Sequence, residues 1–184
     1  MTPARSLLIA MVAIVVLIGS RPIAGDDQFP RGLMASADPR TPNRSCTIET
    51  RPLSFGIYDT LAETDLNAIG QIIYTCENGN GGGPGRAKPP EQQGIRIEVA
   101  QGYGNSFAPR RMFGLGGSRL EYNIYLDATH RMVWGTGEGP TQVYIDTNPP
   151  NRTPVIVPAF GRIFGRQEVQ AGPYTDDVPV RILF

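Results

Sequence analysis

The sequence predicts an all-β fold, a β-sandwich of seven or eight short strands in a single domain. Three observations support this prediction. Apolar and polar residues alternate over several short stretches, which is the period of a half-buried strand. The 22 glycines and 17 prolines separate these stretches, as expected where turns join short strands. No long stretch follows the period of an amphipathic helix.

The expected strands follow one another between turn signals. Two short strands are expected on either side of Pro52, a residue that suits a sheet edge or a switch between sheets. In the next strand Gly70 lies on the inward face, where another backbone or a large side chain could approach closely. The stretch 60–67 is expected to be a polar connection, with room for one helical turn, and 102–118 a loop. The expected strands are 46–57, 68–76, 95–99, 120–126, 141–146, 153–164 and 177–184.

The terminal strand is the element that the rest of the prediction depends on. It places Val178, Val180, Ile182 and Phe184 on one face, and it stops on an apolar residue. Such a strand either lies inside its sheet or leaves a place for another strand beside it.

The chain begins with a predicted export signal. Arg5 precedes an apolar run over residues 7–18, which is short for a membrane span of about 20 residues. We expect a signal peptide over residues 1–25, the alternative being an uncleaved anchor, and no membrane span in the mature chain. Without residues 1–25, which contain two arginines and no acid, the net charge is about −2, which argues against nucleic acid as a partner.

An N-terminal arm is expected over residues 26–45. It is polar and contains three prolines, a composition typical of a disordered segment. A weak alternating register places four apolar residues on one face: Phe29, Leu33, Ala35 and Ala37.

Cys46 and Cys76 are the two cysteines of the chain. In an exported protein such a pair predicts one disulfide, worth about 3–4 kcal/mol by chain entropy. The alternative is a metal or redox pair, which a chain with one histidine and no Cys-x-x-Cys motif disfavours.

No active-site motif is apparent, so we expect that the protein is not an enzyme and that it binds no cofactor and no metal. The single histidine, His130, is expected on the surface. The pair Arg110–Arg111 and the pair Asp176–Asp177 are expected to face water. The Gly-rich stretch 78–94 lacks the residues of a phosphate loop and is expected to be a flexible loop.

Several of these stretches together resemble the spore coat protein U domain, which is found in secreted subunits of archaic chaperone–usher pili. The stretches occur in the same order, and the likeness covers residues 46–184, the expected domain. They are Leu-Ser-Phe-Gly-Ile-Tyr-Asp at 53–59, Gly-Gln-Ile-Ile-Tyr-Thr-Cys at 70–76, Leu-Glu-Tyr-Asn-Ile-Tyr-Leu-Asp at 120–127, Val-Trp-Gly-Thr-Gly at 133–137, and 161–184 with its Gly-Pro-Tyr-Thr-Asp-Asp-Val-Pro-Val-Arg-Ile-Leu-Phe ending.

The resemblance implies an incomplete immunoglobulin-like β-sandwich that lacks its last strand. A periplasmic pilus chaperone would lend that strand, an outer-membrane usher would assemble the fibre, and the arm of a neighbouring pilus subunit would then replace the chaperone. The acceptor groove would be lined by Val178, Val180, Ile182 and Phe184, and the donor arm would use Phe29, Leu33, Ala35 and Ala37. The disulfide Cys46–Cys76 also fits the family.

We therefore expect a secreted, non-enzymatic subunit of a surface pilus that passes through the periplasm and serves adhesion or biofilm formation. The alternative is a stand-alone secreted binding module for carbohydrate or extracellular matrix, with Trp134, Tyr103 and Tyr125 on its loops. The alternative predicts a stable monomer from the domain alone, whereas a pilus subunit should be unstable until a strand is added.

Overall fold

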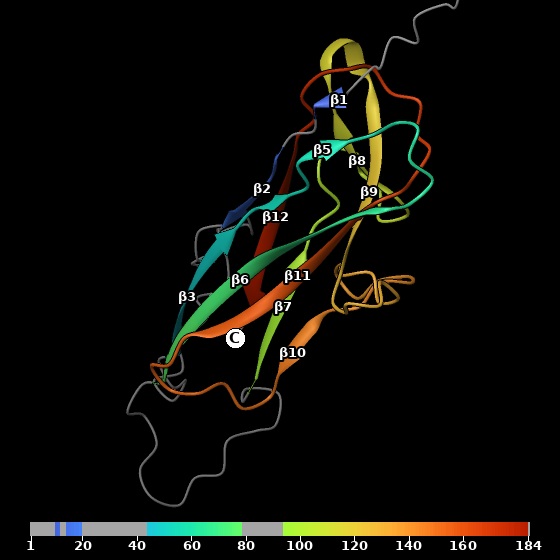
Figure 1. Cartoon of the computed structure of the whole chain (residues 1–184). Helices are drawn as coiled ribbons and strands as arrows, with labels where there is room; N and C mark the ends of the chain where they lie inside the picture. The colour runs from blue at the N-terminus through green and yellow to red at the C-terminus, as the bar shows by residue number, and fades with distance from the viewer. Residues whose placement is uncertain (1–9, 12–13, 20–43, 79–93, 184) are drawn as a thin grey trace, which may run out of the picture.

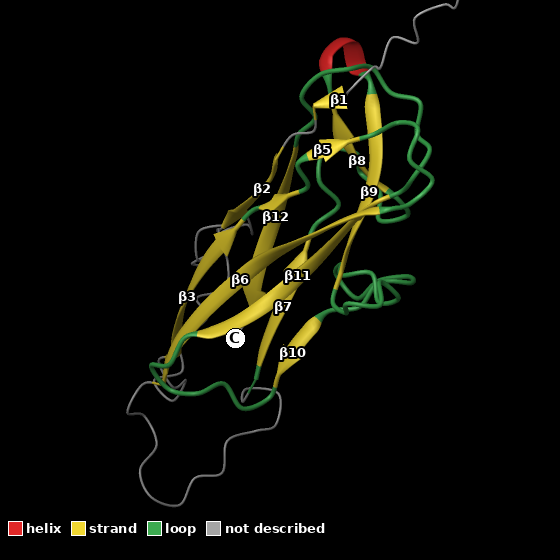
Figure 2. Ribbon diagram, in the orientation of Figure 1, coloured by secondary structure: helices red, strands yellow, loops and turns green. Residues whose placement is uncertain are grey.

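Two five-stranded sheets enclose one core in the computed structural model, which describes residues 10–11, 14–19, 44–78 and 94–183 (Figure 1). In the described residues the one helical element is a short 3-10 turn, Leu115–Gly117, and the rest is strand and loop (Figure 2). The strands are β1 (Ala10–Met11), β2 (Ile14–Gly19), β3 (Arg44–Arg51), β4 (Leu53–Ser54), β5 (Ile57–Tyr58), β6 (Leu66–Asn78), β7 (Ile95–Val99), β8 (Arg110–Phe113), β9 (Arg119–Tyr125), β10 (Tyr144–Asp146), β11 (Val155–Ile163) and β12 (Asp176–Leu183).

The first sheet, called the β6 sheet below, has the order β3–β6–β11–β9–β8, and all its neighbours run antiparallel. Strand β6, which lies between the edge strand β3 and the central strand β11, is the longest of the described strands, with 13 residues. Inward residues of β6 alternate with outward ones as the sequence predicts. A Cβ on Gly70 would lie 2.9 Å from the Arg51 carbonyl oxygen and 3.1 Å from Leu53 Cγ. The predicted close approach at this glycine is confirmed.

The second sheet, called the β12 sheet below, has the order β10–β7–β12–β2–β4. β12 pairs antiparallel with β7 on one side and parallel with β2 on the other. β2 in turn pairs antiparallel with β4. The short strands β1 and β5 form a separate two-stranded pair.

Pro52 separates two strands that belong to different sheets. β3, just before it, pairs with β6, whereas β4, just after it, pairs with β2 in the β12 sheet. Proline has no N–H to donate to a ladder, so the chain leaves one sheet here and enters the other. The predicted strand switch is confirmed.

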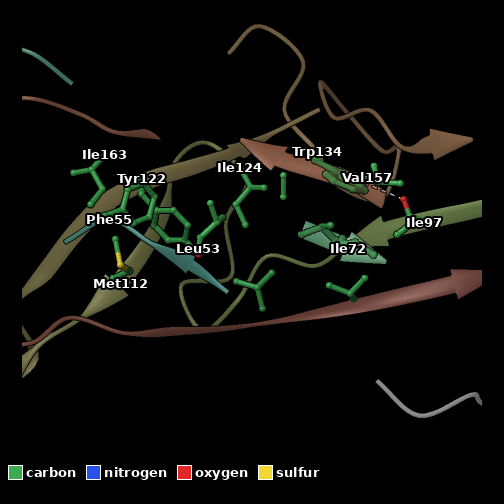
Figure 3. Packing of buried hydrophobic residues seen from close by; sticks show 14 of the residues in the cluster. Leu53, Phe55, Ile72, Ile97, Met112, Tyr122, Ile124, Trp134, Val157 and Ile163 are labelled. Carbon is green, nitrogen blue, oxygen red and sulfur yellow. Dashed lines mark hydrogen bonds between the residues drawn. The ribbon is translucent and has the colours of Figure 1, made fainter. Parts of the chain in front are cut away.

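The core between the sheets is built from large apolar and aromatic side chains (Figure 3). Phe55 and Tyr122 meet edge to face with ring centroids 6.2 Å apart. Trp134 is completely buried, and its indole N–H donates to the Ile97 carbonyl at 3.0 Å. Each such side chain contributes on the order of 1.5–3 kcal/mol through burial alone.

The predicted disulfide between Cys46 and Cys76 is present, and it joins directly opposed residues of β3 and β6. It therefore fastens the edge strand β3 of the β6 sheet to the neighbouring strand β6. The structure describes no free cysteine.

Several strand boundaries differ from the sequence prediction. The stretch 102–118 contains β8, which was expected to be loop, because Arg110 and Met112 point into the core. The stretch 60–67 holds no helical turn; β6 begins within it, at Leu66. The expected strand 141–146 shortens to β10, because the Thr141 side chain closes a turn with Glu138 O and Gly137 N instead.

Alternation also breaks after Phe55. Ile57 lies two positions after Phe55, where strict alternation would place it on the same face, but Ile57 is exposed and Tyr58 is buried. Gly56, with φ +78°, has a backbone conformation that favours glycine, and it reverses the faces of the following residues. The Tyr58 hydroxyl donates to Phe164 O at 2.9 Å and accepts from Gln167 N at 2.8 Å.

Candidate functional site

The candidate site is the strand position between β12 and β4, called the acceptor position below. β12 and β4 do not pair with each other, and β2 lies between them in the sheet order. β2 is in register with five residues of β12, from Asp176 to Val180, and with two residues of β4. In the described part of the chain, β2 is the one strand that pairs with this edge of β12.

The occupant of the acceptor position comes from an unexpected part of the chain. Residues 14–19 lie inside the segment 1–25 that the sequence predicts to be an export signal. The predicted donor residues Phe29, Leu33, Ala35 and Ala37 lie outside the described residues. The edge of β12 is thus covered, from Asp176 to Val180, by residues 14–19 of its own chain.

The inward face of β12 agrees with the alternation in the sequence. Val178 and Val180 are fully buried and Ile182 is half-buried, with β2 in place. Phe184, the fourth predicted groove residue, lies outside the described residues. Because β2 reaches Val180 but not Ile182, Val178 and Val180 are the predicted groove residues directly opposite the occupant.

The other wall of the acceptor position is β4, and Leu53 is its buried residue. Leu53 and Phe55 pack against Gly161 of β11, where a Cβ would lie 2.8 Å from Leu53 Cδ2 and 2.6 Å from Phe55 Cζ. Sequence spacing alone could not show that β4 borders the same strand position as β12, because the two strands are distant in the chain.

A buried carboxylate anchors the beginning of β12. The Asp176 carboxylate accepts hydrogen bonds from the Tyr122 hydroxyl at 2.7 Å and from Tyr103 N at 2.8 Å. Burial raises the pKa of Asp176 above the usual range of an aspartate, against the effect of these two hydrogen bonds. The expectation that Asp176 and Asp177 face water is wrong for Asp176, whose partners come from distant segments. Asp177 is half-buried and accepts from the Tyr103 hydroxyl at 2.7 Å.

A second buried polar side chain joins the two sheets. Arg110 of β8 was expected to be solvated, but it is fully buried. Its guanidinium donates to Asn123 Oδ1 at 2.7 Å, to the Trp134 carbonyl at 2.6 Å and to the carbonyls of Val99 and Ala100. Burial lowers the pKa of Arg110 to about 10, so it stays charged at neutral pH.

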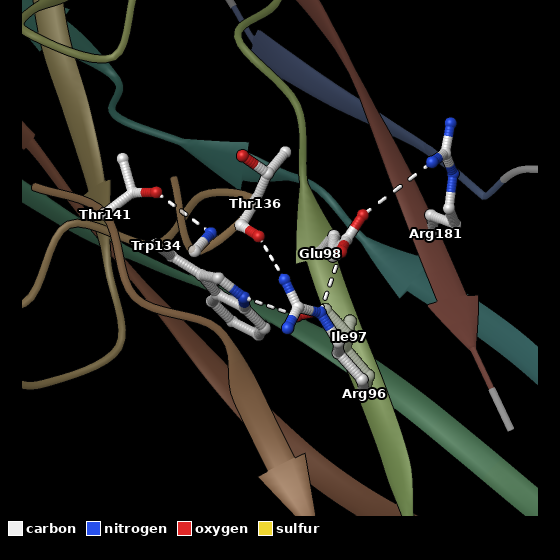
Figure 4. A network of polar contacts seen from close by, with 8 residues as sticks. Arg96, Ile97, Glu98, Trp134, Thr136, Thr141 and Arg181 are labelled. Carbon is white, nitrogen blue, oxygen red and sulfur yellow. Dashed lines mark hydrogen bonds and ion pairs between the residues drawn. The ribbon is translucent and has the colours of Figure 1, made fainter. Parts of the chain in front are cut away.

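The β7 side of β12 is reinforced by side chains (Figure 4). The Glu98 carboxylate lies between Arg96, at 2.8 Å, and Arg181 of β12, at 3.8 Å. Arg181 and Glu98 are directly opposed in the ladder, and Arg96 also donates to the Thr136 carbonyl. On its β7 side β12 therefore has an ion pair with the domain in addition to backbone pairing.

His130 packs between an aromatic ring and an arginine. It was expected on the surface but is half-buried, with its ring at the edge of Tyr125 and Nδ1 3.0 Å from an Arg162 guanidinium nitrogen. Burial lowers the pKa of His130. Over residues 44–78 and 94–183, no group of three or more His, Cys, Asp or Glu side chains is placed to hold a metal ion.

The three aromatic residues of the alternative binding module are not presented together. Trp134 is fully buried, and Tyr125 belongs to β9 and is 6% exposed. Tyr103 is the exposed member of the three. In the part of the chain that the structure describes, no helix has the length and apolar character needed to cross a membrane.

Comparison with known proteins places these features in a family. The Spore Coat Protein U domain matches residues 34–181. A solved structure, the CsuC–CsuE chaperone–tip adhesion subunit pre-assembly complex of archaic chaperone–usher Csu pili from Acinetobacter baumannii, is similar with a TM-score of 0.51 and 17% identity. The similarity covers 77% of this chain and 40% of that one, and it supports the immunoglobulin-like sandwich predicted from the sequence. No curated protein sequence matches the chain.

Proposed function

The chain belongs to the Spore Coat Protein U domain family, and from this we propose that it is an exported subunit of a chaperone–usher surface pilus. In this function the subunit receives the strand of its acceptor position from another polypeptide. The similar solved structure, a complex of a chaperone with a pilus subunit, supports the same assignment.

One observation carries the proposal. The family match begins at residue 34, so the strand that completes the β12 sheet, residues 14–19, lies outside the matched domain. Once a leader of 25 residues is removed, β12 and β4 would face each other across an empty strand position. Each would present unpaired backbone groups, and the apolar residues between them would meet water, which is unfavourable for a monomer.

The partners follow from this geometry. We propose that a periplasmic chaperone supplies a strand first, that an outer-membrane usher exchanges it, and that the arm of a neighbouring subunit takes its place. The subunit would then pass through the periplasm to the cell surface, where the fibre would serve adhesion or biofilm formation. β-strand addition of this kind gains affinity from main-chain hydrogen bonds and register from side-chain pockets.

The prolines of the arm narrow the donor segment. Pro30 and Pro39 cannot donate to a ladder, so the longest proline-free window that contains the candidate anchors is 31–38. This window has eight residues, which is more than the five residues of β2 that pair with β12. We propose that this window is the donor strand, with Leu33, Ala35 and Ala37 as its anchors. Phe29, the fourth predicted anchor, then falls outside the paired stretch.

The test is strand capture by the chain 26–184. When this protein is produced alone in the periplasm, we expect it to have a low melting temperature or to aggregate. A peptide of residues 29–40, or a chaperone, should raise its melting temperature. A stable monomer that melts at the same temperature with and without the peptide would contradict the proposal and favour the stand-alone binding module.

Substitutions on β12 locate the site. Val180→Asp and Ile182→Asp place a carboxylate on the inward face and should abolish capture of the peptide. Leu183→Asp, on the outward face, is the matched control and should capture it normally. Val180→Ala removes only methyl groups and should weaken capture roughly tenfold, so it reports on the groove even where an aspartate variant does not fold.

A further inference from the structure

We propose that, while the leader is attached, residues 14–19 occupy the acceptor position of their own molecule and close it to strand addition. The inference rests on the proposed function, because it assigns to the leader the place that a partner strand would take. Removal of the leader would then be the step that makes the subunit able to accept a strand.

The backbone arrangement supports this inference. β2 pairs with both walls of the acceptor position at once, parallel to β12 and antiparallel to β4. Val15 is opposite Asp176 on one side and Leu53 on the other. Both edges left open by the domain therefore find partners in a single strand, as a complete sheet requires.

The composition of the two candidate occupants differs. Residues 14–19 read Ile-Val-Val-Leu-Ile-Gly, mostly β-branched and without charge or proline. The arm window 31–38 reads Arg-Gly-Leu-Met-Ala-Ser-Ala-Asp, with a charge at each end and small residues between. β-branched residues favour strands, whereas Gly, Ala and Asp are depleted in them. The leader strand should therefore pair more strongly, and an arm should not displace it while the leader is attached.

A consequence is that the chain with its leader is complete but unable to assemble. The leader strand, which contains no proline, covers the edge of β12 in the same molecule. No strand from a second molecule is then required to complete the sheet. The chain without its leader has the opposite properties, because it lacks a strand and accepts one.

A comparison of four refolded proteins tests the inference. They are the chain 1–184, the chain 26–184, the chain 1–184 with Val15→Pro and Val16→Pro, and a control with Leu7→Pro and Leu8→Pro. The control changes the same apolar run outside β2. We expect 1–184 and the control to melt at a similar high temperature and to bind the 29–40 peptide at least about 100-fold more weakly than 26–184. The proline pair at 15 and 16 should bring 1–184 to the behaviour of 26–184, because proline cannot donate to the ladder.

A disulfide trap tests the register directly. Asp177 of β12 is half-buried and is opposite Val16. In 1–184, Val16→Cys with Asp177→Cys should form a disulfide, seen by mass spectrometry of the unreduced protein. Val16→Cys with Arg181→Cys, four residues further along and about 13 Å away, should not.

The outcomes separate this inference from the proposed function. If the proline pair at 15 and 16 leaves melting and peptide binding as in 1–184, or if the trap does not close, the leader inference is overturned. The proposed function would still stand as long as 26–184 captured the peptide. If 26–184 melts like 1–184 and captures nothing, both are overturned.

Discussion

The two sheets of this molecule differ in where their strands come from. All five strands of the β6 sheet lie between residues 44 and 163, inside the matched domain. The β12 sheet has four strands from the domain and a fifth, β2, from the predicted leader. A sheet whose strands all belong to the domain is complete without any other segment. A sheet that takes one strand from outside the domain could receive a different strand in its place.

Strand lengths account for this division of roles. In the β6 sheet, β6 pairs with β11 over nine positions and with β3 over eight, and a disulfide reinforces the second pair. In the β12 sheet, β4 has two residues and β10 has three. The β6 sheet is therefore the more extensively paired of the two, and under the proposed function the β12 sheet is the one that accepts a strand from another polypeptide.

The largest expected effect comes from the link between the sheets. Arg110→Met should lower the free energy of unfolding by about 3–5 kcal/mol, because the carbonyls of Trp134 and Ala100 lose the charged guanidinium that donates to them. Denaturant unfolding measures this loss. Arg111→Met, at the next position but half-buried on the opposite face, is the control and should cost less than about 1 kcal/mol. Equal losses in the two variants would contradict a special role for Arg110.

Removing the disulfide tests whether the scaffold sheet is separable from the acceptor position. Cys46→Ala with Cys76→Ala should cost about 3–4 kcal/mol, because it frees a loop with a sequence separation of 30. The affinity of the folded variant for the 29–40 peptide should stay within about twofold. A much weaker affinity, measured under conditions where the variant is folded, would show that the two sheets are not independent.

A smaller effect is expected in the pH dependence of stability. The folded pKa of Asp176 is raised by burial, so its contribution is fully present below about pH 4 and is lost as pH rises through the folded pKa. Asp176→Asn should remove this decline and change the free energy of unfolding at pH 7 by about 1 kcal/mol. Tyr122→Phe, which removes a hydrogen bond that lowers this pKa, should make the decline steeper. Denaturant melts at a series of pH values measure it, and identical slopes in wild type and Asp176→Asn would contradict the assignment.

The smallest expected effect concerns the ion pairs on the β7 side of β12. Arg181→Ala should cost less than about 1 kcal/mol, because Arg181 is largely exposed and its contact with Glu98 is 3.8 Å long. The loss should shrink at high salt. Arg166→Ala is the control, because it removes an exposed ion pair, with Glu63, in which neither residue belongs to β12. A loss above about 2 kcal/mol for Arg181→Ala would mean that β12 depends on this contact more than its exposure implies.

The sequence was most informative where a local pattern decides the structure. Alternation placed Val178 and Val180 inward, the missing side chain of Gly70 marked a close approach, and Pro52 marked the strand switch. The cysteine count indicated the disulfide. The first three follow from one residue or from its immediate neighbours, and the disulfide follows from a count of residues, so no knowledge of how distant segments pack was needed.

Other residues could not be placed from the sequence. Arg110 and Asp176 resembled surface charges, and only their distant partners explain why they are buried. Trp134 resembled a loop aromatic until Ile97 supplied an acceptor for its indole. A buried polar group requires a partner, and the identity of that partner depends on how the sheets pack.

The sequence by itself determined the class of fold, the inward faces of β6 and β12, the disulfide and the predicted leader. The tertiary structure decided that β12 and β4 border one strand position, and that residues 14–19 fill it. The physical reason is that alternation depends on each residue and its neighbours in the chain, whereas the pairing of strands depends on which edges remain open once both sheets have formed.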